Sequence, residues 1–134
     1  MAEGRAATVA RLWLGLGWLG LAVVLWGTLT PEPPQLPQLP IPQFDKLEHF
    51  IAFLMLTAWF IAAFPGGRRW LWIAVIYAVL GGIIELVQGW SGFRDAEWLD
   101  WAADCVGVAA GVGYPARWLG ALRRWCMNFY ALRA

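Results

Sequence analysis

Charged residues are scarce in this chain of 134 residues, and their scarcity indicates its solvent. Only 14% of the residues are charged and 60% are hydrophobic, whereas about 25% of a typical soluble domain is charged. A water-exposed surface of this size needs more charged residues than the chain has. We therefore expect much of the surface to face lipid. The formal net charge of +1 gives no reason to expect a nucleic-acid partner. The length has room for one domain, which we expect to span residues 1–134.

Reactive and metal-binding residue types are also few. The two cysteines, Cys105 and Cys126, fall at different levels of the expected topology, so we expect no disulfide. The single histidine, His49, does not define a metal site, and we expect neither a metal nor a cofactor. Ser91 and Cys105 lie in no recognisable nucleophile motif. The sequence alone therefore leaves open whether the protein is an enzyme.

Long apolar runs, by contrast, are abundant. Four of them approach the roughly 20 residues that a helix needs to cross a bilayer. We expect transmembrane helices at about residues 10–29, 46–64, 69–90 and 97–117. Helices are favoured over strands because a spanning segment must satisfy its backbone polar groups, and four strands do not close a barrel. The expected fold class is all-α, a polytopic membrane protein with a four-helix transmembrane bundle.

The first apolar run has a second interpretation. Arg5 and Arg11 precede it, as basic residues precede the core of a signal peptide. However, the run is long for such a core, and no small-x-small cleavage site follows Leu29. We therefore expect a retained helix.

The connections indicate the orientation. Residues 30–44 carry six of the eight prolines and predict an extended loop. With the N-terminus inside, eight of the ten Lys and Arg residues lie on the inner side, and only Lys46 and Arg94 lie outside. Because Lys and Arg concentrate in cytoplasmic loops, we expect a multi-pass protein of the plasma (inner) membrane with both termini in the cytoplasm. Residues 118–134 are either a basic interfacial segment or an extension of the last helix.

Polar side chains gather at the outer ends of these expected helices. Glu85 and Asp104 reach similar depths, roughly 7–9 Å from their helix ends at 1.5 Å per residue. A carboxylate is costly when it faces lipid, so both should face the bundle interior or a water-filled cavity. We also expect Glu85 and His49 to approach each other. The candidate ligand-binding residues are Asp45, Lys46, His49, Glu85, Gln88, Arg94, Asp100 and Asp104.

Small residues share helix faces with these acids. Gly107 and Gly111 lie on the face that carries Asp104, and Gly81 lies on the face that carries Glu85. Small residues let helices approach closely in lipid. We therefore expect the third and fourth helices to pack along these faces, with the acids lining a cleft above the contact.

Structural roles for the same residues remain open. Asp45 followed by Glu48 fits a capping box at the start of the second helix. Lys46 can simply extend toward the headgroups. Glu85 and Asp104 can form a hydrogen-bonded pair with one carboxyl protonated. Most of the eleven tryptophans are expected to be interface anchors.

Taken in order, these motifs resemble the VanZ-like family. Asp45-Lys46-Leu47-Glu48-His49-Phe50 is similar to the family's Asp-Lys-x-x-His-Phe, and Glu85-Leu86-Val87-Gln88 is similar to its Glu-x-x-Gln. Arg94, Asp100, Gly107 and Gly111 follow in the family's order. The motifs cover residues 45–111, which is half of the chain. Asp104 departs from the pattern, because the family usually has Asn at this position.

The resemblance implies a four-helix cell-envelope protein, related to a protein associated with antibiotic resistance to teicoplanin, and no established reaction. We expect its outward polar cleft to engage a membrane lipid headgroup, a lipid-linked envelope precursor or an amphiphilic antibiotic. A phosphate would contact Lys46, His49 and Arg94, whereas an amine would contact Glu85, Asp100 and Asp104. Two alternatives remain. One is an accessory or assembly subunit of a larger membrane complex, and the other is a membrane-embedded acid/base enzyme with His49 as the base.

Overall fold

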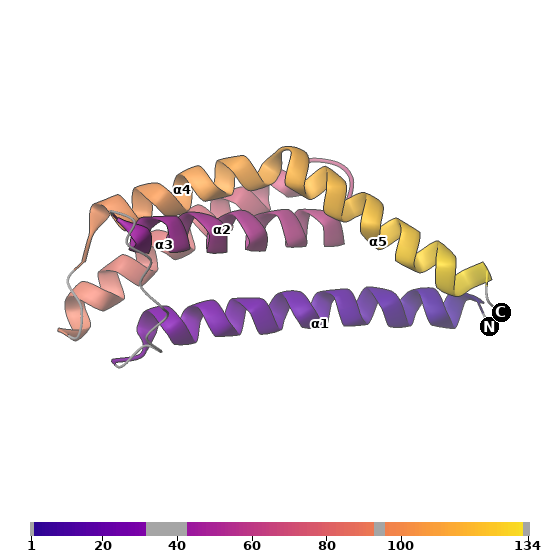
Figure 1. The fold of residues 1–134 in the computed structure, drawn as a ribbon, viewed down its shortest axis with the longest axis horizontal. Coiled ribbons are helices and arrows are strands. Elements are labelled where there is room, and N and C mark those ends of the chain that lie inside the picture. Colours follow the sequence, from indigo (N-terminus) through magenta and orange to yellow (C-terminus); the bar gives the residue numbers. More distant parts are fainter. Residues whose placement is uncertain (1, 32–42, 93–95, 133–134) are drawn as a thin grey trace.

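The computed structural model describes residues 2–31, 43–92 and 96–132, which form five α-helices (Figure 1). The helices are α1 (Ala2–Leu29), α2 (Phe44–Ala63), α3 (Arg69–Ser91), α4 (Trp98–Val112) and α5 (Tyr114–Leu132). No strand occurs among the described residues. The predicted all-α class is therefore confirmed, but the helices number five rather than four.

Three of the helices are long and apolar enough to cross a membrane. They are α1 over Ala6–Leu29, α2 and α3. Large apolar side chains on α1 point away from the protein, and Leu16, Trp18 and Val23 are all more than half exposed. Exposing so much apolar surface is unfavourable in water but not in the hydrocarbon of a membrane. These helices indicate a membrane protein, in agreement with the composition.

The predicted fourth helix, at about residues 97–117, is divided in two. α4 ends at Val112, and α5 begins at Tyr114 on the other side of Gly113. In a continuous helix the ring of Pro115 would clash with the carbonyl of Gly111, and Pro115 has no N–H to donate to it, so the helix breaks at Gly113. The 15 residues of α4 extend only about 22 Å, which is short of the roughly 30 Å of hydrocarbon. The prediction of one continuous helix at this position is wrong.

α5 begins four residues before the tail that the sequence suggested, and it is a helix in its own right. Its buried face contributes Ala116 and Leu119 to a core that also contains Trp13 of α1 and Ala58 of α2. Figure 1 shows α5 leaving the end of α4, passing the end of α2 and reaching the first turns of α1. The tail is therefore a separate helix and does not continue α4.

Close contacts between α2 and α4 hold the centre of the molecule together. A Cβ added at Gly107 would press on the backbone carbonyl oxygen of Phe50, and one added at Gly111 would lie 2.6 Å from that of Leu54. The small-residue face of α4 therefore packs on α2, and the prediction that these glycines pack on the third helix is wrong. Along α3 the prediction is confirmed at Gly81, where a Cβ would lie 2.6 Å from Oδ2 of Asp104.

A pair of tryptophans joins α1 to α2. Trp13 and Trp59 stack with ring centroids 4.1 Å apart. The indole N–H of each donates to the backbone carbonyl of the other, at 2.9 Å from Trp59 and 3.3 Å from Trp13. Trp13 is only 7% exposed, so this tryptophan is a core residue rather than the interface anchor that the sequence suggested.

Different helix ends meet at the two ends of the molecule. The start of α1 and the end of α5 lie together at one end in Figure 1. The starts of α2 and α4 and the end of α3 meet at the other end. The candidate residues that the structure describes belong to this second end, at the start of α2, the last turns of α3 and the first turns of α4.

Candidate functional site

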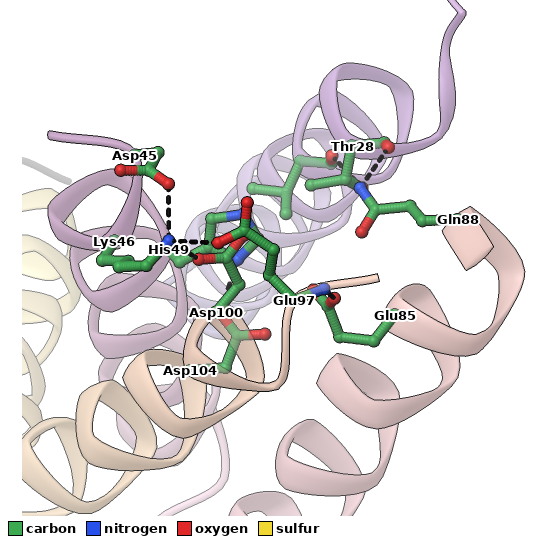
Figure 2. A network of polar contacts seen from close by, with 10 residues as sticks. Thr28, Asp45, Lys46, His49, Glu85, Gln88, Glu97, Asp100 and Asp104 are labelled. Carbon is green, nitrogen blue, oxygen red and sulfur yellow. Dashed lines mark hydrogen bonds and ion pairs between the residues drawn. The ribbon is translucent and has the colours of Figure 1, made fainter. Parts of the chain in front are cut away.

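Seven polar residues from α2, α3 and the start of α4 form the site, which we call the polar cluster. Its members are Asp45, Lys46, His49, Glu85, Glu97, Asp100 and Asp104. Figure 2 shows their side chains converging from three helices. Helix geometry explains the convergence, because the acids of α4 and the polar residues of α2 follow one another at one-turn spacing on facing sides.

Lys46 is the centre of the outer part of the cluster. Its Nζ donates to Oδ2 of Asp45 at 2.7 Å, to Oε2 of Glu97 at 2.7 Å and to Oδ1 of Asp100 at 2.8 Å. An ammonium group has three N–H donors, and these contacts use all of them. The Lys46 contacts therefore bind the first turn of α2 to the start of α4. The side chains of Asp45 and Glu97 remain 52% exposed, so this part reaches the surface.

His49 lies one turn further along α2 and faces two acids of α4. Its Nδ1 is 3.0 Å from Oδ1 of Asp104, and its Nε2 is 3.8 Å from Oδ2 of Asp100. The first distance is that of a hydrogen bond and the second is longer than one. The histidine side chain is 11% exposed and that of Asp104 is fully buried. This part of the cluster therefore lies beneath the surface.

Glu85 approaches the same region from α3. Its side chain is fully buried, and Oε2 accepts a hydrogen bond of 2.8 Å from the backbone N–H of Glu97. Glu97 is the cap residue of α4, so Glu85 fixes the start of α4 to α3. The remaining carboxyl oxygens, Oε1 of Glu85 and Oδ2 of Asp104, are buried and have no hydrogen-bond partner among the described residues.

His49, Glu85 and Asp104 therefore meet at one point. One donor atom from each residue lies within 4.8 Å of the others, so the expected approach of Glu85 and His49 is confirmed. Glu85 and Asp104 are fully buried and do not line an open cleft. The acids form a covered group whose outer side is closed by Lys46 and its partners.

Gln88 stands apart from this group. Nε2 of Gln88 donates to the backbone carbonyl of Thr28 at 2.8 Å, which links α3 to the last turn of α1 (Figure 2). The last carbonyls of a helix lack partners within the helix, so this contact supports the end of α1. Arg94 lies outside the described residues.

The structure differs from the sequence predictions at two places. The cap residue of α2 is Gln43, which makes no side-chain capping bond, so the capping-box interpretation of Asp45 and Glu48 is wrong. Glu97 belongs to the site although it is not among the candidates predicted from the sequence. Its signal was its place directly before the helix that carries Asp100 and Asp104.

The charges of the polar cluster are unbalanced. It holds five carboxyl groups against one lysine and one histidine. Of the five, Glu85 and Asp104 are fully buried, where the low dielectric strengthens repulsion between like charges. The cluster therefore favours a positively charged partner over an anion.

A cleft of about 900 Å³ lies at the opposite end of the bundle, near the junction of α4 and α5. Its walls are largely apolar and include Trp70 and Trp118, with Arg117 and Arg124 as its charged residues. None of the candidate site residues lines this cleft. The polar cluster and the cleft are therefore separate features.

No family model, no curated protein and no solved structure matches this chain, so the resemblance to the VanZ-like family rests on the sequence motifs alone.

Proposed function

We propose that the chain is a VanZ-like envelope protein whose polar cluster binds the positively charged headgroup of a membrane amphiphile. The amphiphile is a lipid, a lipid-linked envelope precursor or an amphiphilic antibiotic that carries an amine. The observation that carries this proposal is the excess of carboxyl groups where α2, α3 and α4 meet at one end of the bundle. In a protein with three apolar helices of spanning length, that end lies where headgroups are found.

The contacts of Lys46 support an amine rather than a phosphate. All three N–H donors of Lys46 already meet carboxylates, so an incoming phosphate would have to break those bonds. A carboxylate, in contrast, offers about four lone-pair positions. Asp45 and Glu97 each give one of these to Lys46 and are half exposed. They have capacity for a second ammonium group that arrives from the surface.

A membrane-embedded acid/base enzyme is the second candidate. The contact of 3.0 Å between Nδ1 of His49 and Oδ1 of Asp104 favours it, because a carboxylate that orients a histidine is a common arrangement of a general base. Under this alternative, His49→Ala would abolish turnover of an amphiphile, whereas headgroup binding at Asp45 and Glu97 would persist.

The binding proposal is tested with two lipids of identical acyl chains. Purified protein is exchanged into phosphatidylethanolamine or phosphatidylglycerol, and retained lipid is counted by native mass spectrometry. The wild type should retain the amine-bearing lipid preferentially, and the double variant Asp45→Asn/Glu97→Gln should lose that preference. Glu48→Gln is the matched control, because the Glu48 side chain makes no hydrogen bond or ion pair among the residues that the structure describes. Equal retention of both lipids by the wild type, or an unchanged preference in the double variant, would refute the proposal.

A further inference from the structure

The buried part of the polar cluster has the geometry of a metal site. His49, Glu85 and Asp104 come from α2, α3 and α4, and one donor atom of each lies within 4.8 Å of the others. Nδ1 of His49 and Oδ1 of Asp104 are 3.0 Å apart. Donors that bind one Zn²⁺ tetrahedrally at about 2.0–2.2 Å stand roughly 3.3–3.6 Å from each other. Nδ1 of His49 and Oδ1 of Asp104 would move apart by a few tenths of an ångström, and Glu85 needs only a modest approach.

Two unpartnered oxygens point independently to a cation. Oε1 of Glu85 and Oδ2 of Asp104 are buried, and neither has a hydrogen-bond partner among the described residues. Both side chains are fully buried, and Figure 2 shows them entering the same region from α3 and α4. A buried carboxylate oxygen without a partner is costly, even where the other oxygen of the same group is bonded. One divalent cation would bind both residues and neutralise their two charges together.

The surroundings hold these three side chains in place, as metal ligands require. The Glu97 backbone N–H donates to Glu85, and Oδ2 of Asp100, which is itself bonded to Lys46, lies 3.8 Å from Nε2 of His49. In many metal sites a carboxylate accepts a hydrogen bond from the outer nitrogen of a ligand histidine, and a small approach of Asp100 would form this bond. Gly81 leaves room for Asp104, since a Cβ there would lie 2.6 Å from Oδ2.

A second acidic group in the cluster does not fit a metal. Donor atoms of Asp45, Glu97 and Asp100 also lie within 4.8 Å of one another. However, Nζ of Lys46 lies 2.7–2.8 Å from an oxygen of each. The ammonium group already takes the place that a cation would need. This group therefore serves as an internal control for the first.

We infer that His49, Glu85 and Asp104 bind one divalent transition-metal ion, of which Zn²⁺ is the best match. One imidazole nitrogen with two carboxylates suits Zn²⁺ and similar first-row ions, whereas Ca²⁺ and Mg²⁺ prefer oxygen ligands alone. The ion would join α2, α3 and α4 at their common end. This inference goes beyond the proposed function and does not depend on it, because it needs no amphiphile.

The test titrates the metal-free full chain with Co²⁺ alone, in a neutral detergent with no lipid added. Visible absorption reports cobalt coordination, competition with Zn²⁺ reports relative affinity, and elemental analysis gives the stoichiometry. We expect one ion per chain. Glu85→Gln, Asp104→Asn and His49→Gln should each weaken binding by more than the roughly 10–100-fold that changes outside the ligand set cause. Asp45→Asn should leave the affinity within about twofold of wild type, because its partner is Lys46.

A measurement on the wild type alone guards against variants that fail to fold. Zn²⁺ should raise the thermal unfolding temperature in a concentration-dependent manner, and a chelator should reverse the increase. Absence of cobalt coordination at neutral pH would overturn the inference. So would equal weakening by Asp45→Asn and Asp104→Asn. Metal binding without any headgroup preference would refute only the proposed function, and a headgroup preference without metal binding would refute only this inference.

Discussion

At the scale of single residues, Asp104 is the position where this chain differs from the VanZ-like motifs that it resembles. Its contacts indicate what the side chain does there. The residue is fully buried, and Oδ1 lies 3.0 Å from Nδ1 of His49. An asparagine at this position retains a side-chain oxygen and nitrogen of similar reach and can still bond the histidine. We therefore expect that, in the absence of metal, the contact with His49 depends on hydrogen-bonding capacity rather than on a charge.

Substitutions at Asp104 separate these two requirements. In metal-free protein, Asp104→Asn should unfold close to the wild-type temperature. Asp104→Leu should be destabilised by about 1–3 kcal/mol, because it leaves a nitrogen of His49 buried without its partner. Thermal unfolding in detergent with a chelator present measures both. If Asn is as harmful as Leu, the charge of Asp104 is needed for stability even without metal.

At the scale of helices, close approach of backbones decides which helix faces which. α4 can reach α2 because Gly107 and Gly111 carry no side chain where the carbonyls of Phe50 and Leu54 lie. This approach places Asp100 and Asp104 beside Lys46 and His49. The arrangement of the polar cluster therefore depends on glycines two to three turns away from Asp100.

Replacing a glycine of α4 with alanine, which adds one methyl group, tests the contact between α2 and α4. Gly107→Ala should lower the free energy of unfolding by about 1–3 kcal/mol, because the added carbon meets backbone atoms that cannot move aside. Gly15→Ala in α1 is the matched control, since a Cβ there has no atom within 4 Å. It should be neutral or stabilising by up to about 1 kcal/mol. Equal stability of the two variants would argue against close packing at Gly107.

At the scale of the whole molecule, the two ends of the bundle are chemically distinct. The N-terminal end of α1 and the C-terminal end of α5 lie together (Figure 1), and Arg117 and Arg124 line the cleft near the α4–α5 junction. The polar cluster occupies the other end. Arginines near the termini and acids at the opposite end agree with the bias of Lys and Arg along the sequence.

Reporter fusions test the orientation. A cytoplasmic reporter fused after Ala134 should be active, and an extracytoplasmic reporter inserted near Gln38, outside the described residues, should be active on the other side. The reason is the excess of Lys and Arg on the side of the termini. Activity of an extracytoplasmic reporter after Ala134 would reverse the topology and place the polar cluster on the cytoplasmic face.

The sequence by itself determined the solvent, the helical class and the convergence of polar residues at one end. These follow from local quantities, because hydropathy sets which segments enter lipid and the helical repeat sets which residues share a face. It also contained the signal for the break between α4 and α5, since Gly113 and Pro115 stand inside the run that predicted one helix.

Only the tertiary structure decided the partners. That Lys46 bonds three carboxylates, that Gly107 packs on α2 and that His49 meets Asp104 all depend on how each helix is rotated about its axis. Rotation is set by close packing between segments far apart in the chain, here by glycines against backbone carbonyls. The pattern within one helix contains no information about the face that its neighbour presents, so only the tertiary structure shows that Glu85 and Asp104 meet the single histidine.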